Sequence, residues 1–152
     1  MELNRKVRFG NAIRYFVKKR ISLTKKNLVG IGVIVFIGLF IMPALAADRF
    51  ADHGDGTVTD TKTGLMWATK DNGSLINWPN ALSYCQNYGG GGYSDWRMPA
   101  VKELTSIVNR DERIPAVNAD FFPQTEPLFY WTSTVLTGSP NEAWSVRFLA
   151  GL

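Results

Sequence analysis

The stretch GGYSDWRMPAVKEL, residues 91–104, says most about the fold of this chain. It joins the end of a glycine run to a Trp-Arg pair and then to a segment that begins with a proline. Proline is tolerated in the first turn of a helix, and apolar residues recur after it at helical spacing. A helix is therefore predicted from Pro99 or Ala100 to Asn109. Its inward face is expected to carry Val101, Leu104, Ile107 and Val108.

A second helix and a hairpin precede this stretch. The helix is predicted over residues 79–88, because Asn77 is placed to cap it and Pro79 fits its first turn. The glycine run at residues 89–92 ends it. Before the helix, residues 57–60 and 65–68 flank a polar turn that ends in a glycine able to adopt positive φ, which predicts a hairpin.

The chain after the central stretch is expected to be a long loop followed by a second hairpin. Residues 111–127 contain three prolines and little periodicity, and loops of this kind often carry a binding site. Residues 130–136 and 143–149 have the composition of strands, and the turn formers at residues 137–142 join them. The predicted fold class is α+β, with two short helices packed on short antiparallel strands and hairpins.

The first 46 residues have the composition of an export leader. Nine basic residues precede an uncharged segment at residues 27–47, which is almost wholly apolar over residues 28–42. Pro43 interrupts that segment, and small residues follow it, so cleavage between Ala46 and Ala47 is expected. The alternative is an uncleaved anchor, because the apolar run approaches the roughly 20 residues that span a bilayer.

Either alternative places residues 47–152 across the cytoplasmic membrane. We therefore expect a periplasmic, cell-surface or secreted domain, or one anchored in the inner membrane and facing outward. The membrane would be contacted only through the N-terminal segment.

The charge of the domain differs in sign from that of the whole chain. The leader holds nine basic residues and one acid, which leaves 17 − 9 = 8 basic and 13 − 1 = 12 acidic residues, a net charge of −4. The net charge of +4 for the whole chain therefore belongs to the leader and does not predict nucleic-acid binding. All five tryptophans lie in residues 47–152, where most are expected to form an aromatic core.

Five segments occur in the order and spacing of the C-terminal domain of the Legionella collagen-like adhesin family, which residues 49–148 resemble. They are RFADHGDGTVTDTKTGLMW, NWPNALSYC, GGYSDWRMPAVKEL, YWTSTVL and AWSVRF. The resemblance implies an exported, C-type-lectin-like domain used for attachment, with glycan binding known for the adhesin. It also assigns a structural role to Trp67, Trp78, Trp96, Arg97, Pro99, Glu103, Trp131 and Trp144.

Two departures from the family pattern have consequences. Ala100 replaces the threonine or similar residue that caps the helix in relatives, a loss expected to cost about 1 kcal/mol. Relatives also continue through a final strand in the central sheet, which we expect to be missing here. Its cysteine would pair with the equivalent of Cys85, the only cysteine of this chain. A domain without that strand is expected to be marginal or to pair with a strand from another chain.

The chemistry-bearing residues do not predict an enzyme. His53 is the only histidine, which excludes a site with two histidine ligands, and Cys85 is expected to be buried and inert. The acidic stretch around Asp52, Asp55 and Asp60 does not follow the spacing of a calcium-binding helix-loop-helix loop and is expected to form turns. No metal site and no cofactor are predicted.

The ligand surface is expected on the long loop and the strand that follows it. Basic residues near aromatic rings suit sulfated or uronic sugars. The candidates are Arg110, Arg113, Phe121, Phe122 and Tyr130, with the alternative that the two phenylalanines anchor the loop to the core. The leading hypothesis is an exported, non-enzymatic attachment module for a glycan or another surface polymer. The alternative is a protein-interaction or structural module that forms a homo-oligomer or accepts a strand from a partner chain.

Overall fold

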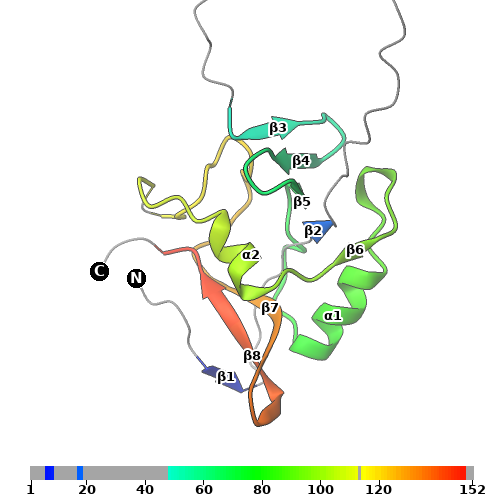
Figure 1. Ribbon diagram of the computed structural model, residues 1–152, viewed down its shortest axis with the longest axis vertical. Helices are drawn as coiled ribbons and strands as arrows, with labels where there is room; N and C mark the ends of the chain where they lie inside the picture. The colour runs from blue at the N-terminus through cyan, green and yellow to red at the C-terminus, as the bar shows by residue number, and fades with distance from the viewer. Residues whose placement is uncertain (1–5, 9–16, 19–47, 113, 150–152) are drawn as a thin grey trace, which may run out of the picture.

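The computed structural model describes residues 6–8, 17–18, 48–112 and 114–149. In this part of the chain, two helices pack on two small antiparallel sheets, which confirms the α+β class (Figure 1). The elements from residue 48 onward are β3 Phe50–Asp52, β4 Thr57–Asp60, β5 Leu65–Ala68, α1 Trp78–Gln86, the 3-10 turn η1 Gly90–Gly92, β6 Trp96–Arg97, α2 Val101–Ser106, β7 Phe129–Leu136 and β8 Ser139–Arg147.

Two further strands come from the basic arm. β1 Lys6–Arg8 pairs with β8, and β2 Val17–Lys18 lies between β5 and β6. The sheets have the orders β1-β8-β7 and β3-β4-β5-β2-β6. These pairings place the described residues of the arm beside strands of the predicted domain. The division at residues 46 and 47, and the predicted cleavage there, fall outside the described residues.

The hairpin of β4 and β5 is confirmed. Thr57 pairs with Ala68 and Asp60 with Leu65, so residues 61–64 form the turn. Gly64 has a φ of 70°, and its N–H donates to the carbonyl of Asp60 at 2.7 Å. Glycine meets this left-handed conformation without the steric cost that a side chain would add.

Helix α1 begins where the sequence predicts. The Asn77 side chain accepts a hydrogen bond from the backbone N–H of Asn80 at 3.0 Å, which is the expected N-cap. The helix ends at Gln86, earlier than predicted, because the N–H of Asn87 is shared between the carbonyls of Ser83 and Tyr84 and that of Tyr88 bonds only to Cys85, three residues back.

Helix α2 is shorter than predicted and ends at Ser106 rather than Asn109. The N–H of Val108 bonds to Thr105 at 3.2 Å, which tightens the last turn. The next N–H, that of Asn109, bonds to the carbonyl of Ala116 at 2.9 Å. The long loop therefore accepts a backbone N–H that would have bonded within the helix if α2 had continued.

The second hairpin has a shorter turn than predicted. Leu136 pairs with Ser139, so the turn consists of Thr137 and Gly138, and β8 starts at residue 139 rather than 143. Gly138 takes a φ of 80°, which suits a two-residue hairpin turn. The turn-forming residues 140–142 lie between the Leu136–Ser139 and Val135–Ala143 pairs, where the register of the hairpin shifts.

Strand β5 divides the core into two clusters. Leu65 and Trp67 face a cluster with Val17, and Met66 and Ala68 face one that contains Cys85. All four β5 side chains are buried, as expected of a strand covered on both faces. Trp67, Trp96 and Trp131 are buried, and Trp78 and Trp144 are half-buried. The helices of the described ranges are all too short or too polar to span a bilayer.

Candidate functional site

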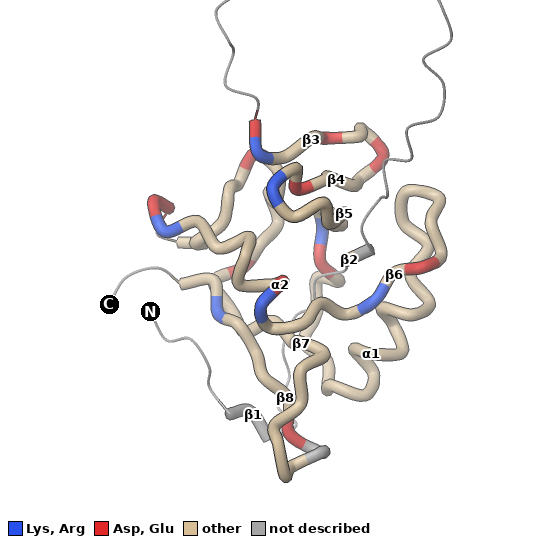
Figure 2. Tube along the Cα trace, in the orientation of Figure 1, with Lys and Arg blue, Asp and Glu red and all other residues tan. Residues whose placement is uncertain are grey.

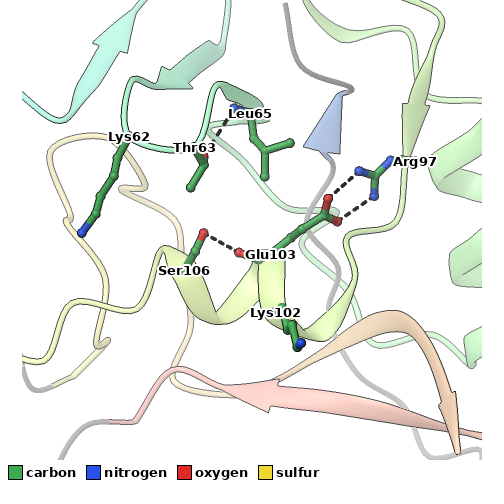
Figure 3. Close-up of a pocket in the computed structure, with 7 residues that line it drawn as sticks. All are labelled: Lys62, Thr63, Leu65, Arg97, Lys102, Glu103 and Ser106. Carbon is green, nitrogen blue, oxygen red and sulfur yellow. Dashed lines mark hydrogen bonds and ion pairs between the residues drawn. The ribbon is translucent and has the colours of Figure 1, made fainter.

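A hollow of about 480 Å³ opens between the β4–β5 turn and helix α2 (Figure 3). We call it the basic pocket. The described residues that line it are Lys62, Thr63, Leu65, Arg97, Lys102, Glu103 and Ser106. Lys62 extends from the turn and Lys102 from the first turn of α2, with Ser106 between them in Figure 3.

Asp60 holds the turn that carries Lys62. One carboxylate oxygen accepts the backbone N–H of Lys62 at 3.0 Å, and the Asp60 carbonyl accepts the N–H of Thr63 at 3.2 Å. These local bonds are typical of aspartate at the start of a turn. The backbone under Lys62 is therefore fixed, while its side chain is exposed to solvent.

Arg49 ties this turn to helix α2. Its guanidinium donates to both carboxylate oxygens of Asp60, at 3.0 and 2.6 Å, and also to the carbonyl of Ser106 at 2.6 Å. Asp60 is fully buried and Arg49 about one third exposed. Burial disfavours the charged carboxylate, but hydrogen bonds from Arg49 and Thr63 and the positive charge of Arg49 outweigh it and lower the pKa of Asp60.

Glu103 closes the other side of the basic pocket. It accepts two hydrogen bonds from the Arg97 guanidinium, at 2.7 and 2.6 Å, and one from the N–H of Ala100 at 2.8 Å. The Arg97 hydrogen bonds lower the pKa of Glu103, and the same contact raises that of Arg97. Arg97 also donates to the Met98 carbonyl at 3.3 Å, so its donors are directed at the protein rather than at the pocket.

Ala100 has no side-chain oxygen, so it cannot cap α2, as expected from the sequence. Half of the capping arrangement remains, because Glu103 still accepts from the Ala100 N–H. A second acceptor comes from β7, where the Thr134 hydroxyl accepts the N–H of Val101 at 3.0 Å. A strand 33 residues along the chain thus replaces part of the missing cap.

The charges that line the basic pocket are positive on balance. Lys62, Arg97 and Lys102 oppose only Glu103, which gives 3 − 1 = +2. Both lysines are exposed, and neither forms an ion pair with an acid among the described residues. The excess is local, because acidic and basic segments are interspersed along the described trace (Figure 2). The two lysine side chains extend from different sides of the hollow in Figure 3, so each ammonium group can meet an anionic group from solvent.

The predicted ligand residues do not form one surface. Phe122 and Tyr130 are fully buried, so the prediction that their rings meet a ligand is wrong. Phe122 packs edge-on against Phe50 at 5.3 Å, and the Tyr130 hydroxyl donates to Asp71 at 3.0 Å. Phe122 thus anchors the long loop, which is the alternative interpretation, and the Tyr130 hydroxyl also accepts the N–H of Glu126 in that loop at 2.8 Å.

The other three candidates lie apart from those two. Phe121 is half-buried, packs against Phe50 at 5.4 Å and lines a smaller hollow of about 220 Å³. Arg110 is exposed on the loop, and Arg113 lies outside the described residues. Neither lysine of the basic pocket was singled out from the sequence as a ligand residue. They line the same pocket because Arg49 ties the turn to α2, a tertiary contact that leaves no periodic pattern in the chain.

The acidic stretch forms turns in the structure. The N–H of Gly54 donates to Asp52 at 2.9 Å, and the N–H and hydroxyl of Thr57 both donate to Asp55. The hydroxyl bond lowers the pKa of the Asp55 carboxyl. Within the described ranges, no three acidic, histidine or cysteine side chains converge as metal ligands. His53 is exposed, with its Nε2 atom 2.8 Å from the Thr59 hydroxyl.

Comparison with known protein families matches residues 56–152 to the Lcl C-terminal domain. The match includes the β4–β5 turn, both helices and the second hairpin. Neither a curated protein nor a solved structure matches the chain. The C-type-lectin-like relationship therefore stays a prediction from the sequence.

Proposed function

This chain belongs to the Lcl C-terminal domain family, and we propose that it is an exported attachment module that binds an anionic surface polymer through the basic pocket. Family membership supports an adhesin-like module in general. The chemistry of the polymer is inferred from the pocket, where two exposed lysines face solvent beside an arginine already bound by a carboxylate. A sulfated or uronic glycan has the matching anionic groups.

A polymer fits this pocket better than a single small anion. Exposed ion pairs each contribute only about 0.2–1 kcal/mol. Two lysines would therefore hold one anionic group weakly, whereas a chain of repeated anionic groups can rebind and bridge several protein molecules. An attachment function needs that kind of multiple contact.

We propose binding rather than catalysis for the same pocket. Among the described residues, its lining contains no histidine or cysteine, and its one carboxylate is engaged by Arg97. Its serine hydroxyl donates to the Glu103 carbonyl at 2.7 Å rather than to a base. This lining supplies anion-binding groups without a nucleophile-base pair.

Site-resolved lysine labelling tests the proposal in the full chain. The basic arm would itself hold an anionic polymer, so total binding is uninformative. We expect a heparin oligosaccharide to slow acetylation of Lys62 and Lys102 by about threefold or more, which corresponds to occupancy of about two thirds or more of the pockets. Lys70, which is exposed outside the pocket, is the matched control. Neutral dextran should protect none of the three.

A variant separates pocket binding from general electrostatic attraction. Lys62→Ala should reduce the protection of Lys102, because both lysines would contact the same polymer chain. Lys70→Ala should leave it unchanged. Equal labelling of Lys62 and Lys102 with and without heparin would refute the proposed ligand class at this site.

A further inference from the structure

Strand β2 occupies an interior position of the five-stranded sheet although it comes from outside the matched domain. Its two residues, Val17 and Lys18, lie between β5 and β6 in the order β3-β4-β5-β2-β6 (Figure 1). The family match begins only at residue 56. Twenty-nine residues, 19–47, separate β2 from the next described part of the chain.

The pairing places β2 against buried residues on both sides. Val17 is opposite Trp67 on β5 and Arg97 on β6, and Lys18 is opposite Met66 and Trp96. Trp67, Met66 and Trp96 are all at most 3 % exposed. Without β2, water would reach the unpaired backbone edges of β5 and β6, two strands that carry core side chains.

Val17 makes the arm part of the core. Its side chain is 0 % exposed and belongs to the cluster of Leu104, Ile107 and Val146. Valine is also a favourable strand residue, because its branched side chain packs well on a pleated surface. One apolar, β-branched side chain is what this position accepts.

Strand β6 depends on β2 for its pairing. In the described part of the protein, β2 is the only strand that pairs with β6, whereas β5 also pairs with β4. Other contacts hold β6 in place: the Trp96 indole donates to the Gly90 carbonyl at 2.9 Å, and Arg97 is bound by Glu103. The two strands beside β2 are thus held by contacts that do not involve β2: β5 pairs with β4, and β6 is bound through Trp96 and Arg97.

We infer that the gap between β5 and β6 is a strand-acceptor site, and that its occupant in the full-length chain is the chain's own N-terminal arm, inserted at Val17. The site takes an extended segment with one apolar, β-branched residue directed into the core. Such strand addition combines backbone hydrogen bonds with a side-chain pocket. The inference applies to the full-length chain before any membrane insertion of the predicted leader, and of the residues that pair with β2 only Arg97 lines the basic pocket.

Hydrogen exchange in the full chain tests the site. Backbone amides of β6 should exchange at least about tenfold more slowly than those of the exposed 53–56 turn, because β2 protects them. Val17→Asp should remove that protection, since a charge cannot enter the core unpaired. Val17→Ile, the matched control, should keep it. Fast β6 exchange in the unchanged chain, or unaltered exchange in Val17→Asp, would overturn the inference.

A peptide separates loss of the occupant from general misfolding. Excess peptide RYFVKKR, residues 14–20, should restore slow exchange in β6 of the Val17→Asp chain. The same peptide with aspartate in place of valine should not. Failure of the native peptide to restore protection would refute a site that accepts strands, whatever the fold of the variant. Heparin labelling of Lys62 and Lys102 is a separate readout, so the two proposals can fail independently.

Discussion

At the scale of single residues, Asp60 does most to organise the candidate site. Its carboxylate holds the turn under Lys62 and receives Arg49, which in turn reaches the last turn of α2. The sequence suggested a turn role for Asp60, and the structure adds its burial and its arginine partner. That partner lies 11 residues away along the chain, in a pairing that residue type alone does not indicate.

Asp60 also makes stability depend on pH. Its folded pKa lies below the ordinary value of 3.8, so the ionised carboxyl stabilises the fold above that value. This contribution should be lost as pH falls from about 4 through the lower folded pKa. Asp60→Asn should cost about 2 kcal/mol at pH 7, less than the roughly 3–5 kcal/mol for breaking a fully buried pair, because Arg49 is partly exposed.

Urea unfolding at several pH values checks this prediction. The unchanged chain should lose stability more steeply than Asp60→Asn as pH falls below about 4, because the folded pKa of Asp60 lies below its ordinary value. Glu103, whose pKa is also lowered from 4.5, contributes to both proteins and serves as common background. Parallel pH profiles for the two proteins would show that Asp60 is not the titrating group.

At the scale of secondary structure, local sequence signals predicted which helices and strands exist better than where those elements begin and end. The β4–β5 hairpin and the Asn77 cap depend on residues within a few positions of one another, and both occur as predicted. The end of α2 depends on the long loop, whose Ala116 carbonyl accepts from Asn109, and the early start of β8 follows from the two-residue turn at Thr137 and Gly138. The first boundary depends on a loop contact that helical periodicity does not indicate, whereas the second depends on a local glycine turn that the sequence predicted only as part of a longer loop.

The start of α2 shows how one element completes another. Thr134 on β7 accepts the Val101 N–H, which Ala100 leaves without a capping side chain. Thr134→Val should therefore destabilise the protein by about 1 kcal/mol, the typical cost of a lost cap or hydrogen bond. Thr134→Ser keeps the hydroxyl and should stay within about 0.5 kcal/mol of the unchanged chain. Both follow from urea midpoints, and equal midpoints for valine and serine would contradict the capping role.

At the scale of the whole molecule, sequence patterns located the domain but not its sites. The family resemblance over residues 49–148 agrees with the match over residues 56–152. The aromatic loop residues were misplaced as ligand contacts because burial, not residue type, decides whether a ring meets solvent. The basic pocket and the β2 position each join segments distant in sequence. The spacing of apolar residues along the chain does not indicate such contacts.

The predicted leader and the strand-acceptor site require the N-terminal arm to lie on different sides of the membrane. If the apolar run at residues 28–42 spans a bilayer, the basic arm and the domain lie on opposite sides of about 30 Å of hydrocarbon. Val17 then cannot reach the gap between β5 and β6. Membrane insertion and occupation of the site by the arm should therefore exclude each other.

Reconstitution of the full chain in nanodiscs tests this exclusion. We expect β6 amides to exchange in nanodiscs as fast as those of Val17→Asp in solution, and added peptide RYFVKKR to slow them again. Val35→Asp places a charge within the apolar run, which disfavours insertion by about 2.5–3.5 kcal/mol, and should preserve slow exchange. Slow β6 exchange in nanodiscs without peptide would mean that arm and domain stay on the same side of the membrane, and the leader would then not be a spanning segment.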